Sequence, residues 1–445
     1  MDQSVQQWVE DHSGEIESLA HDIFTYAEVA DEENQSTRRI ADYLKRHGFS
    51  LESNSGGLPT AFRAVWGKGS PTVGFLGEYD ALPGLDQKPV PYRDGDAGRN
   101  GHGCGHNLLG AGSAAAAVAL RYAMEAKGIP GTVVYYGCPS EEILKGKIIM
   151  ANNGCFRELD AALSWHPGIV YGLGETSYLA MDSVHFFFQG KASHAAGSPE
   201  MGRSALDAAE LMNVGANYLR EHVPDDVRIH YAYMDGPGKP NVVPANAGLW
   251  YFIRARKRTT VDDVTSRILD IAKGAALMTG TRASWEFKTR GYETLVNHTL
   301  CGLYDTVMKQ TPLPAYTGDE LDFAAKLAKH VDNPAADGSI ETVLPPLTGM
   351  VSFMAGSTDV SDVSQVAPTG YMKSVCAPKG FPLHSWQFAA CSDSGIGWKG
   401  MCYAAKVMAQ AGLALLEDPA LLARVKEEFS RTAKGFVPLT AETTS

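Results

Sequence analysis

A cysteine and a histidine stand two residues apart in the glycine-rich stretch Gly101-His102-Gly103-Cys104-Gly105-His106-Asn107. A thiolate sulfur and an imidazole nitrogen both bind borderline divalent ions, and the glycines let the backbone bend close to such an ion. The stretch directly precedes a predicted helix, whose N-terminus would help to hold Cys104 as a thiolate. A glycine-rich turn with a buried cysteine and a surface histidine has the same local pattern, so the spacing alone leaves both interpretations open.

Two adjacent carboxylates, Glu141 and Glu142, follow Cys138-Pro139-Ser140 at the end of a predicted strand. Such a pair can divide the work, because one carboxylate can bind a metal while the other stays free as a general base. Taken alone, the pair also fits an ordinary solvated acidic turn.

Two further histidines extend this set of donors. His166 follows an apolar run and precedes Pro167-Gly168, and His384 lies in Pro382-Leu383-His384-Ser385-Trp386. Each of them alone also fits a structural histidine. Taken together, five residues supply nitrogen, sulfur and oxygen donors for two borderline ions that share a bridging ligand and a water: Cys104, His106, Glu142, His166 and His384.

Short apolar runs alternate with helical patterns in the first part of the chain. The runs at 72–76, 132–136 and 161–165 predict strands, and an alanine-rich helix is predicted at 108–126. Apolar residues at helical spacing predict further helices, one over 5–24 and one that ends at Gly48. This alternation predicts a mostly parallel sheet with helices on both faces. Ligands of such sheets bind at the carboxyl ends of the strands, so we expect the polar residues that follow each run to converge on one crevice.

The pattern changes near Asp182. Strands are predicted at 184–189, 229–234, 249–254 and 283–288, with helices at 204–222 and 261–278. This βαββαβ order is typical of a ferredoxin-like unit, and α/β-type sequence resumes after Tyr292. The predicted fold class is therefore α/β, with a catalytic domain in two parts (1–182 and 293–445) and an inserted ferredoxin-like α+β lid or dimerisation domain (183–292).

Composition excludes several classes of partner. The 445 residues include 39 Lys and Arg against 51 Asp and Glu, a formal charge of −12, which disfavours nucleic-acid binding. The most apolar run, 108–120, is shorter than the roughly 20 residues that a bilayer requires, so no membrane partner is expected. Seven cysteines, an odd number, are typical of a reducing compartment, and the N-terminus shows no signal-peptide pattern. We therefore expect a soluble cytoplasmic protein.

Six short motifs, in their order along the chain, resemble those of the aminoacylase/carboxypeptidase family of binuclear metallohydrolases, in its amidohydrolase branch. The first four similar motifs are Gly-Cys-Gly-His at 103–106, Cys-Pro-Ser-Glu-Glu at 138–142, Trp-His-Pro at 165–167 and Ala-Ser-His-Ala-Ala at 192–196. The others are Pro-Asn-Val-Val-Pro at 240–244 and Leu-His-Ser-Trp at 383–386. Segments 77–84 and 357–360 resemble in particular the p-aminobenzoyl-glutamate hydrolases, in the group of their B subunits.

The resemblance implies a role for each donor. Cys104 would bridge two Mn²⁺ or Zn²⁺ ions, and His106, Glu142, His166 and His384 would complete the two sites. Glu141 would carry the proton from the attacking water to the departing amine. Glu78-Tyr79-Asp80 replaces the Asp-x-Asp of many relatives, and Asn107 replaces a frequent Asp, so the groups that orient the ligands differ here.

Substrate contacts are expected from the inserted domain. The resemblance implies that His194, reaching across from a partner subunit, donates to the developing oxyanion. Arg254 would bind the substrate carboxylate, and Asn241 would provide a second polar contact. A solvated loop histidine and a surface ion pair are the alternatives for His194 and Arg254.

The expected activity is metal-dependent hydrolysis of the amide bond of an N-aroyl or N-acyl amino acid. The first substrate to test is p-aminobenzoyl-glutamate, cleaved to p-aminobenzoate and glutamate. Hydrolysis of indole-acetyl-aspartate, of another acyl amino acid or of an aryl amine is the alternative within the family. A non-catalytic binding or regulatory subunit is the alternative of another class. The expected assembly is a homodimer or a heterodimer with a related subunit.

Overall fold

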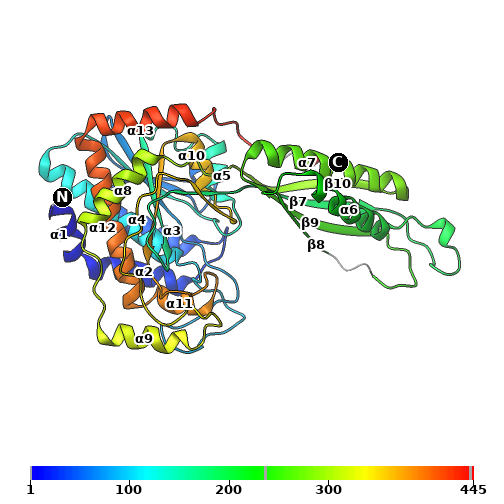
Figure 1. Ribbon diagram of the computed structural model, residues 1–445, viewed down its shortest axis with the longest axis horizontal. Coiled ribbons are helices and arrows are strands. Elements are labelled where there is room, and N and C mark those ends of the chain that lie inside the picture. The colour runs from blue at the N-terminus through cyan, green and yellow to red at the C-terminus, as the bar shows by residue number, and fades with distance from the viewer. Residues whose placement is uncertain (1–2, 235–237, 440–442, 445) are drawn as a thin grey trace. The chain divides into compact units, whose positions relative to one another are not determined.

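The computed structural model describes residues 3–234, 238–439 and 443–444. The chain divides into two compact units (Figure 1). The first unit contains the residues up to Thr176 together with Leu295–Ser352 and Val363–Phe436, and the second contains Ser177–Thr294, Phe353–Asp362 and the described residues from Val437 on. Within the described ranges, no helix combines the length and the hydropathy needed to cross a membrane.

The first unit is built on a six-stranded sheet with the order β1-β2-β4-β3-β5-β12. Strands β4, β3, β5 and β12 run parallel, whereas β2 is antiparallel to both of its neighbours. The prediction of a mostly parallel sheet is therefore confirmed. The strands are β1 (Ser50–Ser53), β2 (Phe62–Lys68), β3 (Thr72–Gly77), β4 (Gly131–Gly137), β5 (Ala161–Gly168) and β12 (Thr369–Val375).

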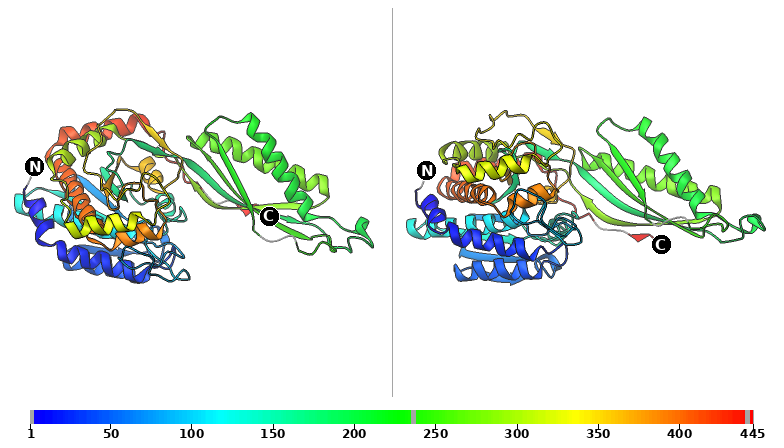
Figure 2. Two further views of the ribbon diagram at one scale, coloured as in Figure 1. Left: turned by 60° about the horizontal axis from the view of Figure 1, so that its bottom comes forward. Right: turned by 90° about the horizontal axis from the view of Figure 1, so that it is seen from below.

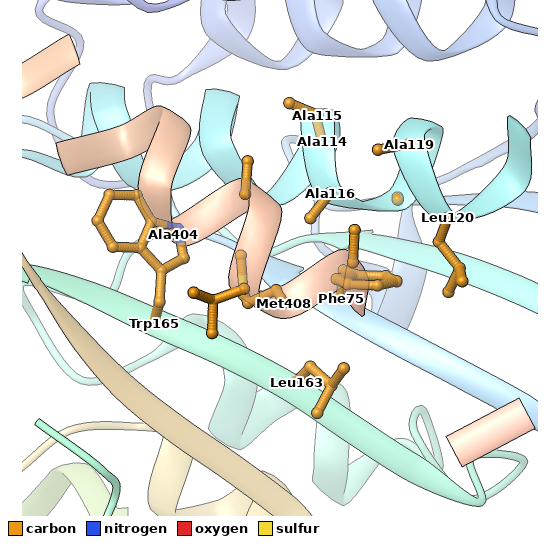
Figure 3. Packing of buried hydrophobic residues seen from close by; sticks show 14 of the residues in the cluster. Phe75, Ala114, Ala115, Ala116, Ala119, Leu120, Leu163, Trp165, Ala404 and Met408 are labelled. Atoms are coloured by element: carbon orange, nitrogen blue, oxygen red, sulfur yellow. The ribbon is translucent and has the colours of Figure 1, made fainter. Parts of the chain in front are cut away.

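Two long helices, α4 (His106–Lys127) and α12 (Gly395–Glu417), pack against each other and against the central strands. Figure 3 shows the alanines of α4 beside Ala404 and Met408 of α12, with Phe75, Leu163 and Trp165 of the sheet next to them. Small side chains on α4 allow this close packing. On the opposite face of β4, Phe156 packs on Tyr136 with ring centroids 4.7 Å apart.

The remaining helices of the first unit surround this core (Figures 1 and 2). They are α1 (Gln3–Asp11), α2 (Ser13–Tyr26), α3 (Asn34–Arg46), α5 (Gly146–Asn152), α8 (His298–Gln310), α9 (Gly318–Ala328), α11 (Trp386–Ser392) and α13 (Pro419–Thr432). Helix α10 (Val360–Val366) and the short strands β6 (Thr176–Tyr178) and β11 (Ser352–Met354) lie where the chain passes between the units.

The helix predicted over residues 5–24 is divided into α1 and α2 at His12. The ring of His12 stacks on Trp8, and its Nδ1 donates to the Trp8 carbonyl at 2.8 Å. This side chain thus satisfies a carbonyl at the end of α1, where the helix stops. Helix α3 ends just before Gly48, whose φ of +84° marks the predicted stop.

The second unit contains the antiparallel sheet β13-β10-β7-β9-β8. Both long helices, α6 and α7, contact this sheet and each other, and they lie on the same face of it (Figures 1 and 2). The order of β7, α6, β8, β9, α7 and β10 along the chain is βαββαβ, and the strand order is that of a ferredoxin-like unit, as predicted. The elements are β7 (Ala180–Gln189), α6 (Ala205–Leu219), β8 (Arg228–Tyr233), β9 (Asn246–Ala255), α7 (Arg258–Thr279), β10 (Arg282–Gly291) and β13 (Thr443–Thr444).

Glycine at position 110 allows α4 to touch the end of β3. A Cβ added to Gly110 would lie 2.6 Å from the carbonyl oxygen of Glu78, a backbone atom that cannot rotate away. The backbone of α4 can therefore approach the end of β3 this closely only because residue 110 has no side chain.

We expect Gly110→Ala to destabilise the first unit by about 1–3 kcal/mol, because the helix must shift away from β3. Gly302→Ala in α8 is the matched control, since a Cβ there meets no atom within 4 Å. The control should be neutral or stabilising by up to about 1 kcal/mol, the gain in helix propensity. Urea unfolding of both variants measures the difference, and equal stabilities would show that the approach of α4 to β3 is not tight.

Candidate metal centre

The carboxylate of Asp80 connects two segments that follow different strands. Its Oδ1 accepts a hydrogen bond from Nδ1 of His106 at 2.8 Å, and its Oδ2 accepts one from the backbone N–H of Glu142, also at 2.8 Å. Asp80 is fully buried, so both bonds are shielded from water. Because Nδ1 of His106 carries the donated hydrogen, Nε2 of the neutral ring is left as a bare lone pair.

The five expected metal donors form two groups. Cys104, His106 and His166 have one donor atom each within 4.8 Å of one another, and so do Cys104, Glu142 and His384. Cys104 belongs to both groups. Within them, Sγ of Cys104 lies 3.4 Å from Nε2 of His166, and Oε2 of Glu142 lies 3.4 Å from Nε2 of His384. Asp80 after β3, Glu142 after β4 and His166 near the end of β5 thus lie in one region, as expected from the strand ends.

The ring of His166 is held in the form that binds metal. Its Nδ1 lies 2.6 Å from the carbonyl oxygen of Pro167, which can only accept, so Nδ1 carries the hydrogen and Nε2 faces Cys104. Burial, together with the positive charge of His106, lowers the pKa of His166 to about 3. A neutral imidazole with a free Nε2 is the ligand form of histidine.

The turn before Glu141 is fixed by two acids from the N-terminal part of the chain. Ser140 has a φ of +59°, which is rare for a residue with a side chain. Its N–H donates to Glu33 at 2.8 Å, and its hydroxyl donates to Asp31 at 3.0 Å. These bonds stabilise a backbone conformation that would otherwise be unfavourable. They also fix the position of the chain just before Glu141 and Glu142.

The loop that carries His384 is attached directly to the glycine-rich stretch. His384 has a φ of +58°, and its N–H donates to the carbonyl of Gly103 at 2.9 Å. A Cβ on Gly103 would meet the end of the Leu85 side chain and would lie 3.3 Å from the carbonyl oxygen of Ser385, so the two segments pack closely here. The imidazole of His384 itself is about half exposed, at 54%, which leaves this edge of the donor cluster open to a substrate.

Acidic groups are concentrated in this buried region. Burial, reinforced by the negative charges of Asp80 and Glu78, raises the pKa of Glu142 to about 7, against the lowering effect of His106. Burial also raises the pKa of the Cys104 thiol. Nε2 of His106, Oε1 of Glu142 and Oε2 of Glu78 are buried without a hydrogen-bond partner. Bare nitrogen and oxygen donors beside a cysteine fit divalent cations such as Zn²⁺ or Mn²⁺.

Sequence patterns did not single out two residues of this region. Lys147 is fully buried, and its Nζ lies 2.8 Å from Oε1 of Glu78. Glu33 is also fully buried and accepts from Thr60 as well as from Ser140. Both residues lie outside any motif, and a charged residue in a single sequence gives no local sign that it is buried.

Two polar residues of the glycine-rich stretch point away from the donors. Nε2 of His102 donates to the carbonyl of Ile23 at 3.0 Å, and the amide of Asn107 donates to the carbonyl of Ser392 at 2.8 Å. They connect the stretch to α2 and α11. Asn107, which replaces a frequent Asp of the relatives, therefore has a structural role, and the group that orients His106 is Asp80.

The three expected substrate contacts lie in the second unit. His194 and Asn241 are on paired loops, since Ala195 N–H donates to the Asn241 carbonyl at 3.1 Å. These loops continue from the end of the sheet where Gln189 pairs with Asn246, whereas Arg254 pairs with Met181 at the other end. Arg254 is eight positions after Asn246 in strand β9, which is about 26 Å at 3.3 Å per residue. The fold thus brings His194 and Asn241 together but keeps Arg254 apart from them.

We expect Asp80→Asn to weaken Zn²⁺ binding by about 10- to 100-fold, the usual effect of losing the group that orients a ligating histidine. An asparagine side chain has one acceptor oxygen and cannot replace both bonds. Asp160→Asn is the control, because Asp160 accepts from Thr72 at the opposite end of β3. Titration against a chromophoric chelator measures both affinities, and an unchanged affinity in Asp80→Asn would contradict the orienting role.

The raised pKa of the buried Glu33 predicts that the stability of the protein depends on pH. Burial, together with the charge of Asp80, raises this pKa from 4.5 to about 7. The folded state therefore binds more protons than the unfolded state between these values, and this contribution to stability is lost as the pH rises through 7. We expect Glu33→Gln to lose less stability than the wild type between pH 5 and pH 8, at equal metal load. Thermal unfolding at both pH values tests this, and parallel losses in the two proteins would contradict it.

Comparison with known proteins identifies the family. Residues 74–331 match peptidase family M20/M25/M40. The chain is 39% identical over 439 residues to the B subunit of p-aminobenzoyl-glutamate hydrolase from Escherichia coli, covering 92% of this chain and 91% of the relative. It is 29% identical over 438 residues to the Xaa-Arg dipeptidase of Mus musculus, covering 95% and 90%.

A solved structure shows the same fold. The YXEP protein of Bacillus subtilis, described as a dinuclear metal-binding peptidase of the M20 family, superposes with a TM-score of 0.60 at 16% identity, covering 92% of this chain and 99% of that protein. The matched segment includes every residue of the donor cluster except His384. The chain belongs to peptidase family M20/M25/M40 and is a hydrolase.

Proposed function

We propose that this protein is a two-metal amidohydrolase that cleaves the amide bond of an N-aroyl or N-acyl amino acid, with p-aminobenzoyl-glutamate as the first substrate. The observation that carries the proposal is the pair of donor groups that share Cys104, next to the adjacent carboxylates Glu141 and Glu142. The 39% identity to one chain of a p-aminobenzoyl-glutamate hydrolase supports this substrate.

In this proposal Cys104, His106 and His166 would hold one cation, and Cys104, Glu142 and His384 would hold the other. When bound, two divalent cations lower the pKa of a water and polarise the substrate carbonyl. Mn²⁺ and Zn²⁺ both suit a donor set of sulfur, nitrogen and carboxylate oxygen.

Glu141 is the proposed proton carrier. It is adjacent to Glu142, whose backbone N–H is fixed by Asp80, so the position of the whole pair is set by the end of β3. Its carboxylate accepts the proton of the attacking water and delivers it to the amine nitrogen as the C–N bond breaks. An amine is a poor leaving group unless it is protonated, so both transfers are needed.

His194 is the proposed donor to the carbonyl oxygen. Its Nδ1 accepts from the backbone N–H of Gly197 at 2.9 Å, so the hydrogen of the neutral ring is on Nε2. The side chain is exposed, and Nε2–H is available to donate to the oxygen that becomes negative in the transition state.

Arg254 and Asn241 are the proposed contacts to the substrate's amino-acid part. Asn246, where β9 follows the Asn241 loop, lies about 26 Å along the strand from Arg254, and this distance exceeds the length of one small substrate. One copy of the second unit therefore cannot apply both to the same molecule. This supports a dimer in which the two groups contact a substrate from different chains, either as a homodimer or with a related subunit; the word subunit in the name of the Escherichia coli relative supports the second form.

A cytoplasmic location is also part of the proposal. No disulfide joins cysteines in the described part of the chain, which suits a reducing compartment.

Dipeptide hydrolysis is the second candidate activity, because the relative from Mus musculus is a dipeptidase. Both reactions release a free amino acid from an amide, so one set of assays separates them.

The experiment is a substrate panel on the metal-loaded, purified protein. p-Aminobenzoyl-glutamate, indole-acetyl-aspartate, hippurate and an Xaa-Arg dipeptide are compared by the amino acid that each releases. We expect the highest kcat/KM for p-aminobenzoyl-glutamate, complete loss of turnover after chelation, and recovery with Mn²⁺ or Zn²⁺. Glu141→Gln should retain metal but lose about 10²- to 10⁴-fold in kcat, the usual size of a general-base effect.

The same turnover assay includes a control variant and has results that would contradict the proposal. Glu158→Gln, which changes a carboxylate paired with Arg63 on the surface, should keep wild-type turnover. A folded protein that binds no metal would exclude the two-metal mechanism and favour a non-catalytic role. Near-normal turnover of Glu141→Gln would remove the proton carrier from the mechanism, and a preference for the dipeptide would replace the substrate class.

A further inference from the structure

Glu78 has a carboxylate that the proposed reaction does not use. It directly follows β3, and its side chain is almost completely buried, at 1% exposure. Its Oε2 lies 3.3 Å from Nε2 of His106, and Oε2 and Nε2 are both buried without a hydrogen-bond partner. A buried carboxylate oxygen that faces a ring nitrogen without such a bond needs a physical explanation.

The tautomer of His106 explains why the two atoms do not bond. Nδ1 donates its hydrogen to Asp80, so a neutral ring presents only a lone pair at Nε2. Two acceptors that face each other at 3.3 Å repel unless a proton or a metal cation lies between them. Adjacent donors of a tetrahedral Zn²⁺ site, with bonds of about 2.0–2.1 Å, are themselves about 3.3–3.4 Å apart.

Lys147 holds the other oxygen of the same carboxylate. Its Nζ lies 2.8 Å from Oε1 of Glu78, and both side chains are buried. One oxygen is thus fixed by an ammonium group, while the other is directed at Nε2 of His106. An Oε of Glu78, Nε2 or Nδ1 of His106 and an Oε of Glu141 also lie within 4.8 Å of one another, as a third group of possible donors.

From these observations we infer that Glu78 is an additional metal ligand, which binds the same cation as His106 and is held in place by Lys147. The inference rests on the proposed two-metal function and adds a sixth protein donor to it. One oxygen of the carboxylate contacts Lys147, and the other would supply a hard donor next to the imidazole of His106. Lys147 acts as a positioning residue, since its own contact is to Glu78.

The test is Zn²⁺ binding, measured by metal content and by competition with a chromophoric chelator. The main variant is E78Q/K147M, in which neither partner of the buried pair is left charged and alone, so that folding is preserved. We expect the wild type to bind two Zn²⁺ and the double variant to bind one of them at least about 10-fold more weakly. K147M, which keeps the Glu78 carboxylate but removes the contact that positions it, is expected to bind both ions, with a smaller loss of affinity than the double variant.

A matched control separates a local effect from a general one. D160N/K426M removes another carboxylate–lysine pair of the first unit, at the opposite end of β3 from the donors, and should leave both Zn²⁺ affinities unchanged. If E78Q/K147M binds two Zn²⁺ like the wild type, Glu78 is not a ligand and shares only a proton with His106. If K147M loses affinity as much as the double variant, the effect belongs to Lys147 and the inference is also overturned. A wild type that binds no Zn²⁺ would instead refute the two-metal function itself.

Discussion

One buried carboxylate, that of Asp80, determines the geometry of the candidate site. Its two oxygens bind the ring of His106 and the backbone of Glu142, which come from segments that follow different strands. Shortening, lengthening or neutralising this side chain would release both at once. The pKa of Asp80 stays below its ordinary value because the charge of His106 and these hydrogen bonds outweigh the opposing effect of burial. The ionised form is therefore the one that holds the site together.

The charges around Asp80 explain why the region suits cations. Glu78, Asp80 and Glu142 lie in one buried region of the protein, with Lys147 as a neighbouring cation. Each uncompensated buried charge costs several kcal/mol, so a cluster of this kind is unfavourable without added positive charge. Protonation of His106 and of Glu142 provides that charge in the metal-free protein, as the raised pKa values of both groups indicate. Divalent cations would supply it with more favourable geometry, because they contact several donors simultaneously.

Sequence patterns predicted those parts of the fold and the site that depend on local order. Apolar runs ended in polar residues, and parallel strands bring their carboxyl ends to one edge, so the approach of Asp80 to Glu142 followed from their positions. The βαββαβ order of the second unit was predictable for the same reason. The division of the first helix at His12 was not, because the apolar spacing continues through it and only the contact with Trp8 shows the stop. Lys147 and Glu33 were missed because burial of a charge is decided by distant partners.

The segment Glu78-Tyr79-Asp80 shows how a local departure from the family pattern is accommodated. Alternate side chains of extended backbone point to opposite faces, so Glu78 and Asp80 face the donors while Tyr79 is buried in the core and donates to the Thr60 carbonyl at 2.6 Å. The ring of His106 therefore lies between two carboxylates, with Asp80 at Nδ1 and Glu78 near Nε2. Glutamate in place of aspartate at position 78 lengthens only the side chain that faces Nε2 of His106. The orienting contact at Nδ1 is thus retained, and the longer arm at position 78 has a buried lysine, Lys147, to hold it.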